Sequence, residues 1–197
     1  MRKIEFFDDA PVRARLNVVR QVHPPRKHPG NPVLAPARPW EAPGASFCWP
    51  SALYDEEARL FKVWYETLVD GRGYGAYAVS VDGIHWERPD LGLVRWNRST
   101  RHNLFYRGVY RRGPGLPLCP CVVKRGPGDW HLFYWDARTP AGPPGVIHYV
   151  GEDGLHWRPG RRNPVVQTPV DRTRSGGVSD VLRVSYDPVG RQFLLSQ

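Results

Sequence analysis

Three carboxylates of this 197-residue chain stand beside β-prone segments that are far apart in the sequence. Glu66 follows the run Phe61–Tyr65, Asp136 follows His131–Trp135, and Asp180 precedes the last β-prone run. Acidic side chains that converge on one pocket can act as acid and base if burial or a neighbouring charge separates their pKa values. The alternative is structural, because acids at strand ends also form hydrogen bonds and ion pairs with arginine.

Four further side chains could bind a small polar ligand. Trp49 could stack on the apolar face of a sugar ring, although burial in a core is an equally good interpretation. Three arginines could bind hydroxyl, carboxylate or phosphate groups, since the planar guanidinium fork matches the last two. These arginines are Arg138, Arg172 and Arg174.

Metal, nucleotide and cofactor sites have little support in the sequence. The three cysteines, Cys48, Cys119 and Cys121, fit neither a disulfide framework nor the spacing of zinc ligands. His23 and His28 stand alone among prolines. No glycine-rich phosphate loop follows a strand and opens a helix. We therefore expect no cofactor and no metal ligands.

The net charge of +9 raises the question of nucleic-acid binding. Of the 28 basic residues only four are lysine, and the arginines are scattered along the chain rather than clustered in a stripe. Such a balance bears on solubility and non-specific association, so we expect no nucleic-acid partner. The sequence has no apolar run of signal-peptide or membrane-spanning length. We expect no membrane partner and a cytoplasmic location, unless a leader lies outside this chain.

A five-residue phrase that occurs twice indicates how the candidate residues are positioned. Asp82–Trp86 reads Asp-Gly-Ile-His-Trp, and Asp153–Trp157, 71 positions later, reads Asp-Gly-Leu-His-Trp. Each copy follows an apolar β-prone run, and an acid before glycine between two such runs is a strong hairpin signal. A repeat at this spacing indicates supersecondary units that recur along the chain. We expect the two aspartates to stabilise turns and the two tryptophans to pack between units.

The pattern predicts an all-β fold built from four-stranded antiparallel units in tandem. In residues 46–96 the expected strands are 47–54, 60–65, 74–80 and 84–87, and in residues 104–166 they are 121–124, 131–135, 146–150 and one that opens at 155–157. A third unit begins in residues 178–197, where Tyr186-Asp187 and Phe193 repeat Tyr54-Asp55 and Phe61 at a distance of 132 residues. Such units are typical of β-propeller blades, of which about two and a half are present here.

Residues 1–45 form a separate N-terminal segment in this interpretation. Seven prolines from Pro24 to Pro43 exclude a helix and predict an extended chain. We expect a strand over Leu16–Val22, with a helix as the alternative because Val12, Leu16 and Val19 have helical spacing. Two and a half blades cannot close a ring, since an edge strand stays open. We expect a fragment of a propeller, with assembly of several copies as the alternative.

Several motifs resemble the five-bladed β-propeller glycoside hydrolase superfamily, which includes invertases and fructanases, arabinanases and xylosidases, and mannoside phosphorylases. The similarity covers roughly residues 28–197. It rests on Asn31–Leu34, on Tyr54-Asp55 before Phe61–Glu66, and on Ser80–Trp86. The last of these motifs also resembles the Asp-box of sialidases.

The resemblance implies catalysis by two carboxylates, one of which attacks the sugar or activates water while the other protonates the leaving group. In the family these acids stand near the starts of the innermost strands. Here residues 46–51 and 118–122 contain no acid, and only 178–181 supplies one. The resemblance implies glycoside processing, by hydrolysis or phosphorolysis, with a carbohydrate as ligand and Asp180, Glu66 and Asp136 as candidate acids. The alternatives are a non-catalytic carbohydrate-binding propeller and an incomplete fragment without activity.

Overall fold

The computed structural model describes residues 13–14, 16–41, 47, 49–69, 72–107, 118–136, 145–167 and 182–196. The chain divides into two units, residues 1–31 and residues 32–197. In the first unit the described residues belong to no helix or strand. The expected strand over Leu16–Val22 is therefore wrong. Leu16 and Val19 are 84% and 94% exposed, and a strand without a pairing partner has nothing to stabilise it.

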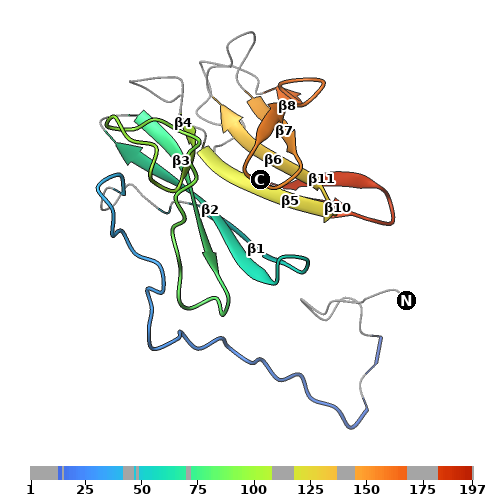
Figure 1. Ribbon diagram of the computed structural model, residues 1–197. Helices are drawn as coiled ribbons and strands as arrows, with labels where there is room; N and C mark the ends of the chain where they lie inside the picture. Colours follow the sequence, from blue (N-terminus) through green and yellow to red (C-terminus); the bar gives the residue numbers. More distant parts are fainter. Residues whose placement is uncertain are drawn as a thin grey trace, which may run out of the picture. The chain divides into compact units, whose positions relative to one another are not determined.

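The first sheet contains β1 (Ser51–Asp55), β2 (Leu60–Val69), β3 (Arg72–Ser80) and β4 (Leu104–Arg107), all antiparallel and in that order (Figure 1). The fourth strand was expected at Ile84–Glu87 and lies instead beyond the predicted boundary at residue 96. Only Glu87 pairs with β3, through a single bridge to Val79. Pro89 follows two residues later, and because proline has no N–H to donate, the ladder does not continue.

The second sheet repeats this plan with β5 (Leu118–Gly126), β6 (Asp129–Asp136) and β7 (Gly145–Gly151). Its fourth position is shared by two short strands that both pair with β7. Strand β8 (Trp157–Pro159) pairs with the end of β7, and β9 (Val166–Gln167) pairs with its beginning. The bridge at Glu87 and strand β4 occupy the corresponding places in the first sheet. The repeat in sequence is thus a repeat in topology.

A third unit begins with the hairpin of β10 (Arg183–Asp187) and β11 (Gln192–Ser196). Tyr186 lies opposite Phe193, with ring centroids 5.3 Å apart, as Tyr54 lies opposite Phe61 at 4.9 Å. The predicted repeat over 132 residues is therefore confirmed in strand register. The hairpin turns also agree, since Arg59 and Arg191 have φ values of 55° and 52° just before the second strand.

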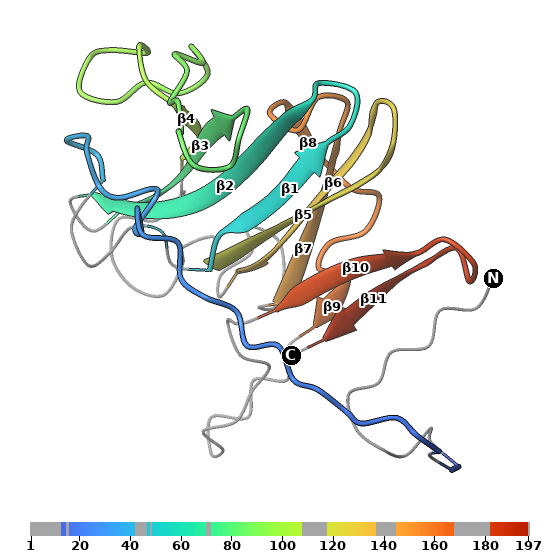
Figure 2. The same ribbon diagram turned by 90° about the horizontal axis from the view of Figure 1, so that it is seen from below.

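The innermost strands of the three units lie against one another (Figure 2). The amide of Val122 in β5 donates to the Ser51 hydroxyl of β1 at 2.9 Å. The preceding residue of β5, Cys121, contacts the backbone of Val184 in β10, with its Sγ 3.2 Å from the amide nitrogen. Contact between the first strands of successive antiparallel sheets is the arrangement of propeller blades. The described residues contain no helix, and so none that could span a membrane.

Apolar side chains fill the spaces between neighbouring units. Trp64 and Tyr77 of the first sheet pack against Trp130, Leu132 and other residues of the second. A second cluster joins the second sheet to the third hairpin; its members are Cys121, Phe133, Val146, Leu182 and Val184. Burial of these side chains, at roughly 25 cal/mol per Å² of apolar surface, is the main force that holds the units together.

The two Asp-Gly phrases form the same turn. Asp82 Oδ1 accepts hydrogen bonds from the amides of Ile84 and His85, both at 2.8 Å. Asp153 Oδ1 accepts the two equivalent bonds at 2.9 and 2.8 Å. In each copy the histidine ring lies 2.6 Å from the second carboxylate oxygen. The predicted role of Asp82 and Asp153 in stabilising these turns is therefore confirmed. Trp157 packs in the cluster between the two sheets, whereas Trp86 packs on the other face of the first sheet.

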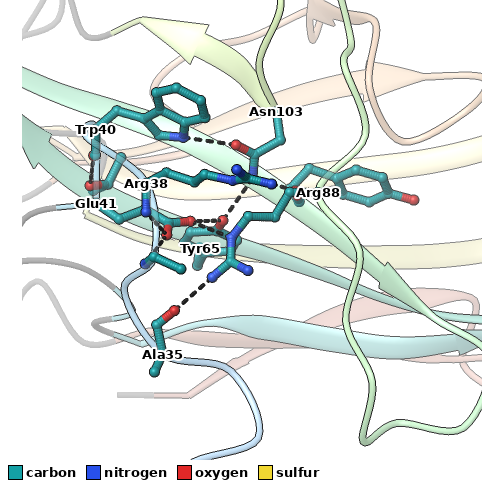
Figure 3. A network of polar contacts seen from close by, with 10 residues as sticks. Ala35, Arg38, Trp40, Glu41, Tyr65, Arg88 and Asn103 are labelled. Atoms are coloured by element: carbon teal, nitrogen blue, oxygen red, sulfur yellow. Dashed lines mark hydrogen bonds and ion pairs between the residues drawn. The ribbon is translucent and has the colours of Figure 1, made fainter.

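That other face is covered by the segment around Glu41, whose carboxylate is 2% exposed (Figure 3). Glu41 Oε1 accepts hydrogen bonds from the Tyr65 hydroxyl at 2.6 Å and from Arg88 Nε at 2.7 Å. Its Oε2 accepts from the amide of Ala37 at 2.8 Å. Burial, together with the bond to this carboxylate, raises the pKa of Tyr65. These donors come from the segment itself, from strand β2 and from Arg88, so the network anchors the segment to the sheet.

Candidate functional site

The segment that leads into the inner strand β1 has unusual backbone geometry. Phe47 and Trp49, which precede β1, have φ values of 65° and 44°. Non-glycine residues seldom adopt positive φ, and aromatic residues do so at a cost. The Phe47 ring is held by stacking on Tyr65, with centroids 4.3 Å apart, and its amide donates to the Glu66 carbonyl at 2.9 Å. Trp49, by contrast, is 45% exposed. Of the two interpretations of Trp49, exposure favours an available aromatic surface over core packing.

The sequence predicted that Glu66 follows the strand over residues 60–65, but it lies within β2. Its side chain is 5% exposed and lines a narrow cavity between the first two sheets, beside Tyr74, Phe105 and Tyr134. The cavity measures about 20 Å³, which is room for about one water molecule. Ligand pockets for small molecules usually measure about 300–1,000 Å³. Within the described residues, Glu66 therefore reaches a water-sized space rather than a sugar-sized one.

Of the other predicted site residues, the structure describes the backbone of one. Asp136 is the last residue of β6, with its backbone opposite Gly145, and its side chain lies outside the described residues. Val69 and Arg72 close the corresponding end of the first sheet. The four remaining predicted residues, Asp180, Arg138, Arg172 and Arg174, lie outside the described residues. Glu66 and Trp49 are thus the two predicted residues whose side chains the structure describes.

The opposite ends of the inner strands hold a charged cluster that sequence reasoning did not identify. Asp55, 3% exposed, contacts Lys62 Nζ at 2.6 Å and Lys124 Nζ at 2.5 Å, and so connects the first sheet to the second. Both ammonium groups also lie over the Trp130 ring, at 4.8 and 5.0 Å. Burial alone would raise the pKa of Asp55, but the hydrogen bonds from the two lysines outweigh it and lower the pKa to about 2. The sequence shows only that lysine is rare, with four in the chain, and two of these four contact this one acid.

Metal binding receives no support from the described ranges. Across residues 49–69, 72–107, 118–136, 145–167 and the shorter described stretches, no group of three or more His, Cys, Asp or Glu side chains could hold an ion.

Comparison with known proteins bears on the fold. No family model matches the chain, and no curated protein sequence matches it. A solved fructofuranosidase variant from Schwanniomyces occidentalis, complexed with fructosylnystose, is similar to this chain with a TM-score of 0.51 and 14% identity. The similarity covers 78% of this chain and 30% of the solved one, so this chain spans less than a third of that protein's length.

Two further solved structures align with a TM-score of 0.43, 17% identity, and coverage of 68% of this chain and 40% of theirs. One is a glycosyl hydrolase from Bacteroides ovatus. The other comes from work on the mannoside phosphorylase family, which contains glycoside hydrolases that target β-1,2-mannosidic linkages in Candida mannan. At such low identity it is the fructofuranosidase likeness that carries weight, and it establishes fold. The chain therefore has the all-β fold of a partial propeller, similar to part of the fructofuranosidase structure.

Proposed function

We propose that this chain binds a carbohydrate at the starts of the inner strands β1, β5 and β10 and takes part in processing a glycoside there. The observation that carries the proposal is the exposed indole of Trp49 at the start of the innermost strand. Aromatic faces bury the apolar C–H surface of a sugar while its hydroxyls find polar partners. The similar fructofuranosidase was solved with fructosylnystose, which supports a carbohydrate as the class of ligand, although function depends on the site and not on the fold.

In the catalytic form of this proposal, two of the acids Asp180, Asp136 and Glu66 divide the roles of general acid and of nucleophile or base. That division requires different environments for the two carboxyl groups. Glu66 is already in an apolar, buried environment, and its 20 Å³ cavity allows it to act through one bound water. Asp180 precedes β10 in the sequence, and β10 contacts the inner strand β5. Arg138, Arg172 and Arg174 would hold substrate hydroxyl, carboxylate or phosphate groups.

A non-catalytic carbohydrate-binding propeller is the second candidate, and one observation favours it. Strand β5 contains no acid, and the only acid of β1 is Asp55, at the opposite end from Trp49 and occupied by two lysines. Two inner strands therefore offer no carboxylate where a glycosidase would use one.

The experiment that separates the two candidates compares Trp49→Ala with Asp180→Asn. Oligosaccharide binding is measured by calorimetry over a panel of fructans and mannans, and turnover is measured with the ligands that bind. Loss of turnover without loss of affinity in Asp180→Asn supports the catalytic form. Affinity that depends on Trp49 alone, with no turnover in the unmodified chain, supports the binding form. If no oligosaccharide binds, or if Trp49→Ala binds as well as the unmodified chain, the proposed site is wrong.

A further inference from the structure

A second cavity opens at the other end of the second sheet, near the turns that join β5 to β6 and β7 to β8. It measures about 650 Å³, within the usual range for small-molecule pockets of about 300–1,000 Å³. Its charged lining consists of four arginines and two carboxylates: Arg125, Arg158, Arg161, Arg162, Asp129 and Glu152. Asp136 and Gly145 lie at the opposite ends of the same strands, so this cavity is separate from the candidate carbohydrate site.

The negative charge of Asp129 is already engaged within the wall of the cavity. Its Oδ2 contacts Arg125 at 2.8 Å, and its Oδ1 lies 2.8 Å from His131 Nε2. Since a carboxylate accepts, His131 Nε2 carries a hydrogen, and Nδ1 of the neutral ring accepts from His148 Nε2 at 2.8 Å. Burial lowers the pKa of His131, and burial with the charges of His131 and Arg125 lowers that of His148 to about 4. Near neutral pH, Arg125 balances Asp129 and both histidines are neutral.

The remaining arginines have no comparable partner. Arg158, Arg161 and Arg162 are exposed, and within the part of the chain that the structure describes none of them forms an ion pair. Glu152 is the one other acid in the lining. The cavity therefore keeps an excess of positive charge, carried by groups whose planar forks bind oxyanions with two hydrogen bonds.

The segment that carries two of these arginines is fixed to the sheet by its neighbours. The Asn163 side chain pairs with both backbone groups of His148, accepting from its amide at 2.7 Å and donating to its carbonyl at 2.9 Å. The Gly160 amide donates to the same carbonyl at 2.9 Å. A Cβ atom at position 160 would lie 2.7 Å from His148 Nδ1, so only glycine permits this approach. Fixed backbone on both sides of Arg161 and Arg162 reduces the ordering cost when a ligand binds.

We propose that this cavity binds a phosphate-bearing small molecule, with Arg158, Arg161 and Arg162 as its ligands to the phosphate. Phosphate is favoured over carboxylate because the guanidinium groups of three arginines that line one cavity suit its several oxygens and double negative charge. The cavity also exceeds a phosphate group in size, which leaves room for the organic part of a phosphate monoester. Inorganic phosphate and a sugar phosphate share this chemistry, and the experiment distinguishes them.

The test measures binding of inorganic phosphate, glucose 6-phosphate, glucuronate and glucose to the full chain by calorimetry at fixed ionic strength. We expect both phosphates to bind, with the ester tighter than the free ion if its organic part fills the cavity. The double variant Arg161→Gln/Arg162→Gln should weaken binding by about tenfold per arginine, as expected for loss of a charge-assisted hydrogen bond. Asn163→Ala, which keeps every arginine, should weaken binding to a smaller extent by releasing the segment.

The matched control is Arg95→Gln/Arg98→Gln, which removes the same charge from exposed positions in the connection between β3 and β4 of the first sheet. We expect its phosphate affinity to equal that of the unmodified chain. Equal weakening in both double variants would show that net charge alone attracts phosphate, and the proposal would be wrong. Absence of phosphate binding at millimolar concentration, or glucuronate binding tighter than either phosphate, would also overturn it. Because the substituted arginines are exposed, loss of folding is not expected, and the unfolding midpoint of each variant checks this.

Discussion

Acid titration of Asp55 tests the contact between the first two blades. A carboxyl whose pKa falls from 3.8 to about 2 on folding contributes about 2 kcal/mol, because each tenfold change in proton affinity is worth about 1.4 kcal/mol. The pKa is lowered in the folded state, so the contribution is complete above pH 4 and is lost as the pH falls from 4 towards 2. Asp55→Asn should therefore lower the free energy of unfolding near pH 7 by at least this amount. It also leaves Lys62 and Lys124, only 12% and 14% exposed, without their common partner.

Urea unfolding at several pH values between 2.5 and 7, followed by tryptophan fluorescence, measures both effects. The unmodified chain should lose stability below pH 4 more steeply than Asp55→Asn. The matched control is Asp187→Asn, since Asp187 ends the corresponding strand of the third hairpin and accepts from the Val189 amide at 2.9 Å. Among the described residues no lysine contacts Asp187, so this substitution should cost less than about 1 kcal/mol, like the loss of an ordinary hydrogen bond. Equal losses in the two variants, or parallel pH profiles for the unmodified chain and Asp55→Asn, would refute the reasoning.

Two further predictions concern His148 and the glycines of the two repeated turns. The pKa of His148 is lowered from 6.5 to about 4, so the unfolded chain binds a proton that the folded chain does not. Stability should fall as the pH drops from 6.5 to 4, by about 2 kcal/mol after allowance for partial solvent screening, and His148→Phe should flatten this slope in urea titrations; an unchanged slope would contradict the assignment. Gly83→Ala and Gly154→Ala place alanine at φ values of 74° and 81°, at a cost of roughly 1–2 kcal/mol each. Only at Gly154 does the new Cβ come within 3.1 Å of Trp64 and Trp130, so thermal unfolding should show a larger loss there, and equal losses would argue against close packing of these rings.

The elements that sequence could predict are those determined by local hydrogen bonds. The Asp82 and Asp153 turns depend on contacts spanning three residues, and the Tyr54–Phe61 and Tyr186–Phe193 pairs depend on one short turn each. Short-range patterns of this kind are visible in the chain as motifs. They led correctly to antiparallel units in tandem and to a propeller.

The misplaced elements depend on contacts between distant residues. Strand β4 joins the first sheet only after the long connection from Glu87, by pairing with Tyr74, Gly75 and Ala76, and nothing in its four residues indicates that distant partner. Glu66 was expected just after a strand that ends at Tyr65, whereas tertiary pairing with Gly75 includes it and extends the strand to Val69. Asp55 became important only because Lys124, 69 positions away, reaches it. Residue type and spacing carry no information on such meetings until the sheets are assembled.

The repeated turns and the variable connections lie at opposite ends of the sheets. The repeated turns, at Asp55, Asp82, Asp153 and Asp187, follow the ends of β1, β3, β7 and β10, which is one end of each sheet. The connections at the other end differ: Val69 and Arg72 are separated by two residues, whereas Asp136 and Gly145 are separated by eight. Repetition in one set of turns and variation in the other is the pattern of a scaffold that carries a site on its variable loops. Substitutions at the repeated turns should accordingly change the free energy of unfolding and leave carbohydrate affinity intact, while substitutions at Trp49 and Asp136 should do the reverse.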